Sequence, residues 1–147
     1  MVLKLFKAAW FLSAVVALAN LLYIYAGIQQ QEIVVQEVEG GALLITRDVF
    51  FYCSLGALAF VNFTVYLTSK VFAKEEDFRA WFHGLVVTIN MFFVIAFSLI
   101  GTYNSAEKFD YSRIGFAIYG SVGLVVVWAV GWPVYRIFKA FATKQAV

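Results

Sequence analysis

The chain has 147 residues, of which 63% are hydrophobic and only 14% are charged, and its formal net charge is +2. Soluble domains carry about 25% charged residues, so the composition excludes an ordinary soluble domain and favours an integral membrane protein. The basic residues flank apolar windows instead of forming one patch, which argues against nucleic-acid binding.

Four windows of the sequence contain no lysine, arginine, aspartate or glutamate. Each is longer than the roughly 20 residues that a helix needs to cross a hydrocarbon core of about 30 Å. We predict spans at about 8–28, 49–69, 80–101 and 114–133, joined by short loops within one domain of residues 1–147. The expected fold is an all-α integral membrane protein, a four-span antiparallel helix bundle with a small exterior β-hairpin in its first loop.

The first window has a second interpretation as a signal peptide. Lys4 and Lys7 form a basic start, and "ALA" at 17–19 resembles a cleavage site. The apolar run nevertheless continues to Ile28, so we interpret it as an uncleaved first span.

Residues 32–47 differ from the apolar windows on either side. "EIVVQEVE" and "ALLITRD" are rich in β-branched residues, and the two glycines between them suit a tight hairpin turn. A two-stranded hairpin is marginally stable alone, so we expect it to lie on the second outer loop, the membrane surface or another subunit. A plain connector is the alternative. The residues expected in the docking contact are Glu37, Glu39, Gly40, Gly41, Lys108 and Arg113.

Three asparagines interrupt the predicted spans, namely Asn20, Asn62 and Asn90. With a rise of about 1.5 Å per residue they share a layer within about 8 Å of depth. Amides in hydrocarbon seek hydrogen-bond partners, so we expect them to join helices to one another. The alternative is a polar lining for a pore or a contact with a partner.

The connection before the third span carries Glu75, Glu76 and Asp77, which we interpret as acids at a helix start because consecutive residues point in different directions. His83, the single histidine, lies near the cytoplasmic end of the third span, where a backbone or lipid hydrogen bond is the expected role. No HExxH, CxxC, GxSxG or phosphate-loop motif occurs. We therefore expect no catalytic residue, no metal and no cofactor, and a protein that is not an enzyme.

The fourth span contains small residues at spacings that let helices approach closely. We expect it to pack tightly, either inside the bundle or against another protein, and residues 134–147 to continue as an interfacial cytoplasmic helix. The residues of the predicted packing face are Gly115, Ala117, Gly120, Ser121 and Gly123.

Charge predicts the orientation of the chain. Eight basic residues flank the spans on the side of the termini and the middle loop, against three on the other side. This bias places both termini in the cytoplasm, in a multi-pass protein of the plasma (inner) membrane.

The absence of charged residues at mid-depth of the spans argues against a self-contained pump or proton-coupled transporter. The leading hypothesis is a non-catalytic accessory or assembly subunit of a larger membrane complex. Its partners would be membrane lipids and other membrane subunits, or a second copy of the chain. A channel or facilitator for a small neutral solute is the alternative, and a lipid- or quinone-binding subunit using His83 is a weaker one.

Overall fold

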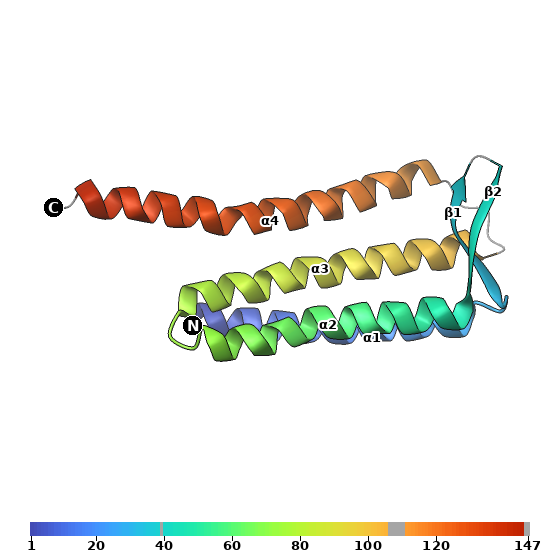
Figure 1. Cartoon of the computed structure of the whole chain (residues 1–147), viewed down its shortest axis with the longest axis horizontal. Helices are drawn as coiled ribbons and strands as arrows, with labels where there is room; N and C mark the ends of the chain where they lie inside the picture. Colours follow the sequence, from blue (N-terminus) through green and yellow to red (C-terminus); the bar gives the residue numbers. More distant parts are fainter. Residues whose placement is uncertain (39, 106–110, 146–147) are drawn as a thin grey trace.

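The computed structural model describes residues 1–38, 40–105 and 111–145, with the side chains of 36–38, 111–114 and 143–145 left out (Figure 1). Within these residues, four helices are long and apolar enough to cross a membrane, and one two-stranded sheet follows the first helix. Each predicted span overlaps one helix, so the predicted number of spanning-length helices and the hairpin are confirmed.

The four helices are α1 (Val2–Gly27), α2 (Arg47–Val71), α3 (Glu76–Tyr103) and α4 (Tyr111–Gln145). Local sequence explains where two of them begin. The Thr46 hydroxyl caps α2 by accepting a hydrogen bond from the Val49 amide, while Glu76 and Asp77 place negative charge at the positive end of α3. The tail expected after the fourth span continues α4 through Pro133 without interruption.

The helices do not pack simply as sequence neighbours. The most extensive contact joins α1 to α3, while α2 and α4 pack on α3 from other sides. Helices α1 and α3 run in the same direction, because Ser13 contacts Asn90 and Asn20, further along α1, contacts Ser98, further along α3. Helices α2 and α3 run in opposite directions, because Phe50 contacts Phe97 whereas Asn62, further along α2, contacts Asn90, earlier in α3.

The hairpin consists of β1 (Glu32–Val38) and β2 (Gly41–Thr46), paired antiparallel. Of the two glycines predicted to form the turn, Gly41 instead pairs with Val38 inside the sheet. Gly40 has φ +94°, a conformation that residues with a Cβ rarely adopt. The register shifts between Val34 and Gln36, as in a β-bulge.

The two ends of the molecule differ in what they carry (Figure 1). At one end, which we name the hairpin end, β1 and β2 lie across the ends of the helices. At the other, which we name the terminal end, lie the start of α1, the α2–α3 connection and the end of α4. The hydrophobic core is concentrated near the hairpin end, in a buried cluster of Leu21, Ile24, Ile28, Ile33, Phe50 and Phe97.

Candidate functional site

Two of the predicted asparagines form the centre of a polar network that joins three helices. The Asn62 and Asn90 side chains exchange hydrogen bonds, with N–O distances of 3.0 and 3.1 Å. From α1, the Trp10 indole donates to Asn62 Oδ1 at 2.8 Å, and the Ser13 hydroxyl accepts from Asn90 Nδ2 at 3.0 Å. Asn62 Nδ2 also donates to the Leu58 carbonyl. Both amides therefore donate their N–H groups to protein atoms inside the bundle.

Asn20 belongs to a second polar contact, nearer the hairpin end. Its Nδ2 donates to the Val94 carbonyl at 3.0 Å and to Ser98 Oγ at 3.2 Å. The predicted layer of three asparagines is thus divided into a pair, Asn62 with Asn90, and a separate α1–α3 contact. Asn90 is fully buried, whereas Asn20 and Asn62 are half-buried.

The hairpin is bound to α3 by Asn104, a residue that the sequence reasoning did not single out. Asn104 Oδ1 accepts from the Val34 amide at 2.8 Å, and its Nδ2 donates to the Val34 carbonyl at 3.0 Å and to the Ile100 carbonyl at 2.8 Å. The side-chain amide thereby pairs with β1 as a neighbouring strand would. On the inner side of β1, Ile33 is fully buried in the core cluster.

Arg47 holds the junction between the sheet and the helices. Its amide donates to the Gln31 carbonyl at 2.8 Å, its guanidinium donates to the Ile28 carbonyl at 3.1 Å, and its charge lies 4.8 Å from the Tyr25 ring centre. The Tyr25 hydroxyl in turn donates to Asp48 at 2.8 Å. The hairpin is therefore attached to the bundle at several points, which a plain connector would not require.

The predicted docking residues of the hairpin lie mostly outside the described residues. This holds for residues 39 and 108 and for the side chains of Glu37 and Arg113. The expected pairing of these acids with Lys108 and Arg113 stays a prediction.

At the terminal end, α4 is joined to α3 by aromatic residues. The Trp81 indole donates to the Trp128 carbonyl at 2.8 Å, and the Trp128 indole donates to the Trp81 carbonyl at 3.0 Å. Trp132 stacks on Trp81, with ring centres 5.6 Å apart. Gly84 permits this approach, because a Cβ there would lie 2.3 Å from a Trp128 ring carbon.

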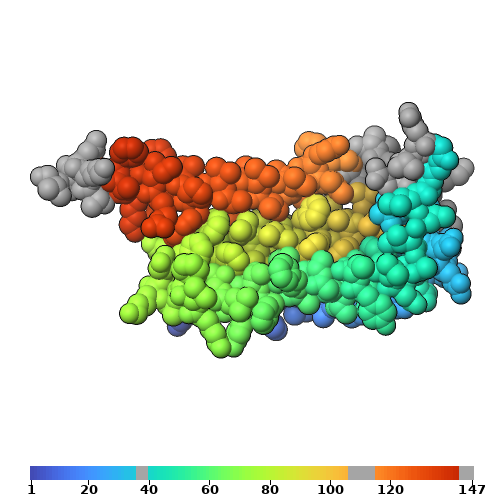
Figure 2. Space-filling view, viewed as in Figure 1, coloured from blue at the N-terminus to red at the C-terminus, as the bar shows by residue number. Residues whose placement is uncertain are grey.

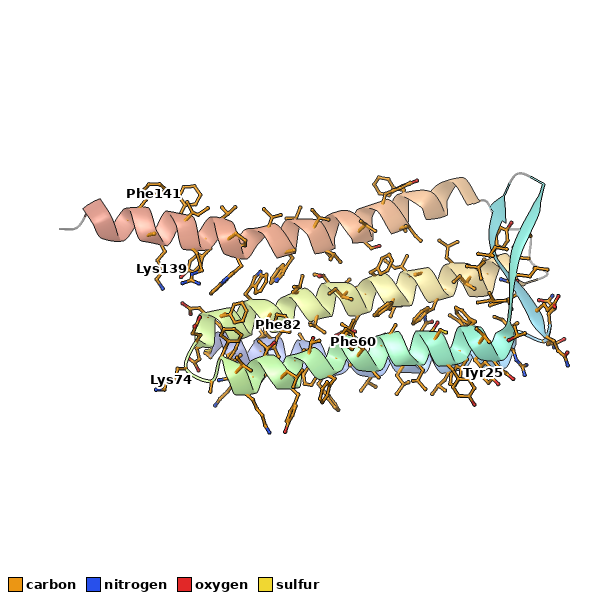
Figure 3. All side chains as sticks on the ribbon, in the orientation of Figure 1. Tyr25, Phe60, Lys74, Phe82, Lys139 and Phe141 are labelled. Atoms are coloured by element: carbon orange, nitrogen blue, oxygen red, sulfur yellow. The ribbon has the colours of Figure 1, made fainter. Side chains whose placement is uncertain are left out.

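Charged side chains lie beyond the aromatic contact, at the start of α3 and near the end of α4. Lys139 extends from α4 toward the α2–α3 connection, whereas Phe141 points away from the other helices (Figure 3). Lys139 Nζ lies 3.6 Å from the Asp77 carboxylate, and both side chains are more than half exposed. Because solvent screens the two charges, the pair contributes little by itself.

The small residues predicted to pack in the fourth span do not form one contact within this chain. Ser121 is buried and donates to the Ile118 carbonyl, whereas Ala117, Gly120 and Gly123 are exposed. A Cβ at Gly120 or Gly123 would meet no atom within 4 Å, and one at Gly115 would meet only the α4 side chain of Tyr119. Figure 2 shows α4 along one side of the molecule, against α3. Another helix of this chain therefore does not approach Gly120 or Gly123 closely, and the expected packing face stays a prediction.

His83, in α3, is buried where α3 faces α1, and its exposed fraction is 2%. Its Nδ1 lies 2.6 Å from the Arg79 carbonyl, and since a carbonyl only accepts, Nδ1 carries the proton. Its ring meets the Trp10 ring edge to face at 5.7 Å. The expected backbone hydrogen bond is present, and both contacts are of a kind that helix packing explains.

Within the described part of the chain, no three histidine, cysteine, aspartate or glutamate side chains come together as a metal site would require. A comparison with known proteins finds no family model, no curated protein and no solved structure that matches this chain. The function must therefore be argued from the geometry of the chain itself.

Proposed function

We propose that this protein is a non-catalytic accessory or assembly subunit of a larger membrane complex, with α4 as its partner-binding helix. The observation that carries the proposal is the open small-residue side of α4. Ala117, Gly120 and Gly131 recur at i, i+3 and i+14, which places them on one side of the helix. All three are exposed, and a Cβ at Gly120 or Gly131 would meet no atom within 4 Å.

Small residues matter here because helices in lipid gain little from hydrophobic burial. They associate through close van der Waals packing, which glycine and alanine permit by letting backbones approach. Glycine also costs about 1 kcal/mol relative to alanine in a helix interior, so an exposed pair without a packing role would be a net loss. A partner helix seated against Gly120 would supply the missing contact.

The rest of the chain does not need α4 for its own internal contacts. Helices α1, α2 and α3 share the network around Asn62 and Asn90, and the core cluster at the hairpin end draws on the same three helices and β1. Among the described side chains of α4, only that of Ser121 is buried. This division supports a role in which α4 contributes its surface to an assembly.

The proposal includes membrane insertion as an antiparallel four-span bundle with both termini in the cytoplasm of a cell bounded by a plasma (inner) membrane. Its support is the charge distribution. Seven basic residues with described side chains, namely Lys4, Lys7, Lys70, Lys74, Arg79, Arg136 and Lys139, belong to segments at the terminal end. Arg47 belongs to the hairpin end, so the positive-inside rule directs the terminal end to the cytoplasm.

Affinity purification in mild detergent from cells with native expression tests the proposal. We expect the wild-type chain to retain a membrane partner that Gly120→Ile loses. Gly56→Ile is the matched control, because Gly56 is an exposed helical glycine on α2 with no atom within 4 Å of an added Cβ. If wild type, Gly120→Ile and Gly56→Ile all purify with the same partners, or with none, the proposal is wrong.

The neutral-solute channel is less well supported. Three asparagines were expected to line it. Asn62 and Asn90 direct their N–H groups to one another, to Ser13 and to the Leu58 carbonyl, and Asn20 donates to the Val94 carbonyl and to Ser98. Flux into liposomes that differs between wild type and Asn90→Leu would revive that alternative.

A further inference from the structure

The two edges of the β1–β2 sheet differ in what covers them. The edge of β1 is occupied by Asn104, whose side-chain amide bonds both backbone groups of Val34. The other edge belongs to β2, and within the described residues no third strand pairs with it. An uncovered strand edge presents a row of backbone N–H and C=O groups that can pair with another chain. The edge of β2 is therefore a candidate interaction surface, which we name the open edge.

The backbone of Val34 shows which groups of β2 face the open edge. Both of its groups bond the α3 amide, away from β2, so Val34 and Leu44 form a non-hydrogen-bonded pair of the ladder. The N–H and C=O of Leu44 consequently face away from β1. The alternation agrees at the base of the hairpin, where the Arg47 amide donates to the Gln31 carbonyl across the ladder. Because the facing alternates along a strand, Ala42 also directs its backbone groups to the open edge.

The open edge has none of the devices that keep strand edges apart. Charged side chains, prolines and bulges usually protect an edge. The sequence of β2 is GALLIT, without charge or proline, and the register shift lies in β1. The Leu43 and Leu44 side chains are 51% and 50% exposed, and β2 lies on the visible surface at the hairpin end (Figure 2). Neither a helix nor a lipid offers a matching row of backbone donors and acceptors, so the partner that fits is an extended strand.

The orientation of β2 identifies this strand as β2 of a second copy. In this chain β2 lies across the ends of the helices (Figure 1). Two copies inserted in the same orientation can be related by a two-fold axis along their helices, and such a rotation reverses a strand that lies across the axis. The two open edges then meet antiparallel, at the same level relative to the membrane. The interface is isologous, as in most homodimers, and β2 brings no like-charge repulsion because it has no charged residue.

We infer that the protein self-associates by antiparallel pairing of β2 with β2 of a second copy, with the two-fold axis at Leu43. In this register Ala42 of each copy exchanges both of its backbone hydrogen bonds with Leu44 of the other, and the Leu43 side chains lie opposite one another. The pairing uses the groups that face the open edge and leaves Thr46 as the cap of α2. It also joins the two hairpins into one larger sheet, and sheets of three or more strands are stable where a lone hairpin is marginal.

Disulfide cross-linking of the full chain in liposomes tests the register. On a Cys53→Ser background, which removes the single cysteine, Leu43→Cys should form a dimer on oxidation. Leu44→Cys is the matched control, because Leu44 is exposed to nearly the same extent. Directly opposite Cβ atoms are about 5 Å apart, whereas the two Leu44 positions are diagonal at about 7–8 Å, so Leu43→Cys should cross-link at least about ten-fold faster.

A proline variant tests the backbone pairing. Leu44→Pro removes an N–H that faces the open edge and leaves the hydrogen bonds to β1 in place, since proline is tolerated on an edge strand. Each dimer loses two hydrogen bonds, so association measured by energy transfer between labelled copies in liposomes should weaken at least about ten-fold. Leu44→Ala keeps the N–H and should associate like the wild type. Amide exchange of Ile45 checks that the hairpin persists, and the cysteine comparison decides the inference if it does not.

The outcomes separate this interface from the proposed role of α4. Gly120→Ile should leave the Leu43→Cys cross-link unchanged, because α4 takes no part in the β2 pairing, and a lost cross-link would place the contact in α4 and overturn the inference. A wild-type chain that stays monomeric at every protein-to-lipid ratio would also overturn it. The same holds if Leu44→Cys cross-links as fast as Leu43→Cys, or if Leu44→Pro with a retained hairpin associates as strongly as Leu44→Ala.

Discussion

Replacing Asn90 with leucine is the most direct test of what holds α1, α2 and α3 together. Asn90 makes two hydrogen bonds with Asn62 and one with Ser13, all between helices. Interhelical hydrogen bonds in membrane proteins average about 0.6 kcal/mol, so the three together amount to about 2 kcal/mol. We therefore expect Asn90→Leu to lower the free energy of unfolding by about 2 kcal/mol.

The measurement is reversible unfolding in mixed micelles, with the double variant Asn62→Leu/Asn90→Leu completing a cycle. Since the two single variants both lose the same reciprocal pair, the double variant should cost about 1 kcal/mol less than the sum of the singles. Met91→Leu, at the adjacent and largely exposed position, is the control and should be close to neutral. A loss below about 0.5 kcal/mol for Asn90→Leu, or strict additivity in the cycle, would show that packing alone joins these helices.

Three other substitutions test contacts elsewhere in the chain. Gly84→Ala should destabilise the α3–α4 contact by about 1–3 kcal/mol through overpacking, seen as a change in tryptophan fluorescence and a lower melting temperature, whereas Gly56→Ala should not; equal behaviour would contradict the close approach. Gly40→Val should disturb the hairpin because of its positive φ, while Gly41→Val should be tolerated, as judged by amide exchange in β1 and β2. Asn104→Ala should raise amide exchange in β1 at least ten-fold without changing exchange in α2, and unchanged protection in β1 would count against its role.

The helices and the hairpin were predictable because their signals are local. Windows without charge mark the spans, and a Gly-Gly pair between β-branched runs marks a turn. Even here the outcome depends on strand pairing, since Gly41 lies in the strand opposite Val38, whereas Gly40 takes the positive φ. The local sequence predicts a turn near the two glycines, and the pairing of the strands decides which of the two glycines belongs to a strand.

The contacts between elements were less predictable, because they depend on how each helix is rotated and placed. Counting residues along the spans placed the three asparagines within about 8 Å of one another in depth, whereas a hydrogen bond needs a distance of about 3 Å. The depth estimate is therefore too coarse to show that Asn62 bonds Asn90 while Asn20 bonds other residues. Asn104 could not be recognised as the hairpin's partner, since its pairing with Val34 joins positions 70 residues apart.

Glycine illustrates the same limit. Small-residue spacing drew attention to Gly120 and Gly123, yet the described glycines that another helix approaches closely include Gly84 and Gly101, both in α3. The spacing of small residues shows where another helix could approach the backbone. The rotation of α4 that brings Trp128 onto Gly84 depends instead on the bulky residues around this contact. The neighbouring Trp81 is one of them, because its indole and that of Trp128 each donate to the other residue's carbonyl.

The distribution of polar contacts explains why α4 can be both attached and available. Near the terminal end, α3 and α4 are joined by the reciprocal hydrogen bonds of Trp81 and Trp128 and by the ion pair of Asp77 with Lys139. Toward the hairpin end α4 carries Gly120 and Ala117, whose surfaces are open, while the neighbouring α1–α3 pair is joined through Asn20 and the core cluster. We therefore expect a partner helix to change α4 more than any other element, because α4 is the helix whose packing in this chain is least complete.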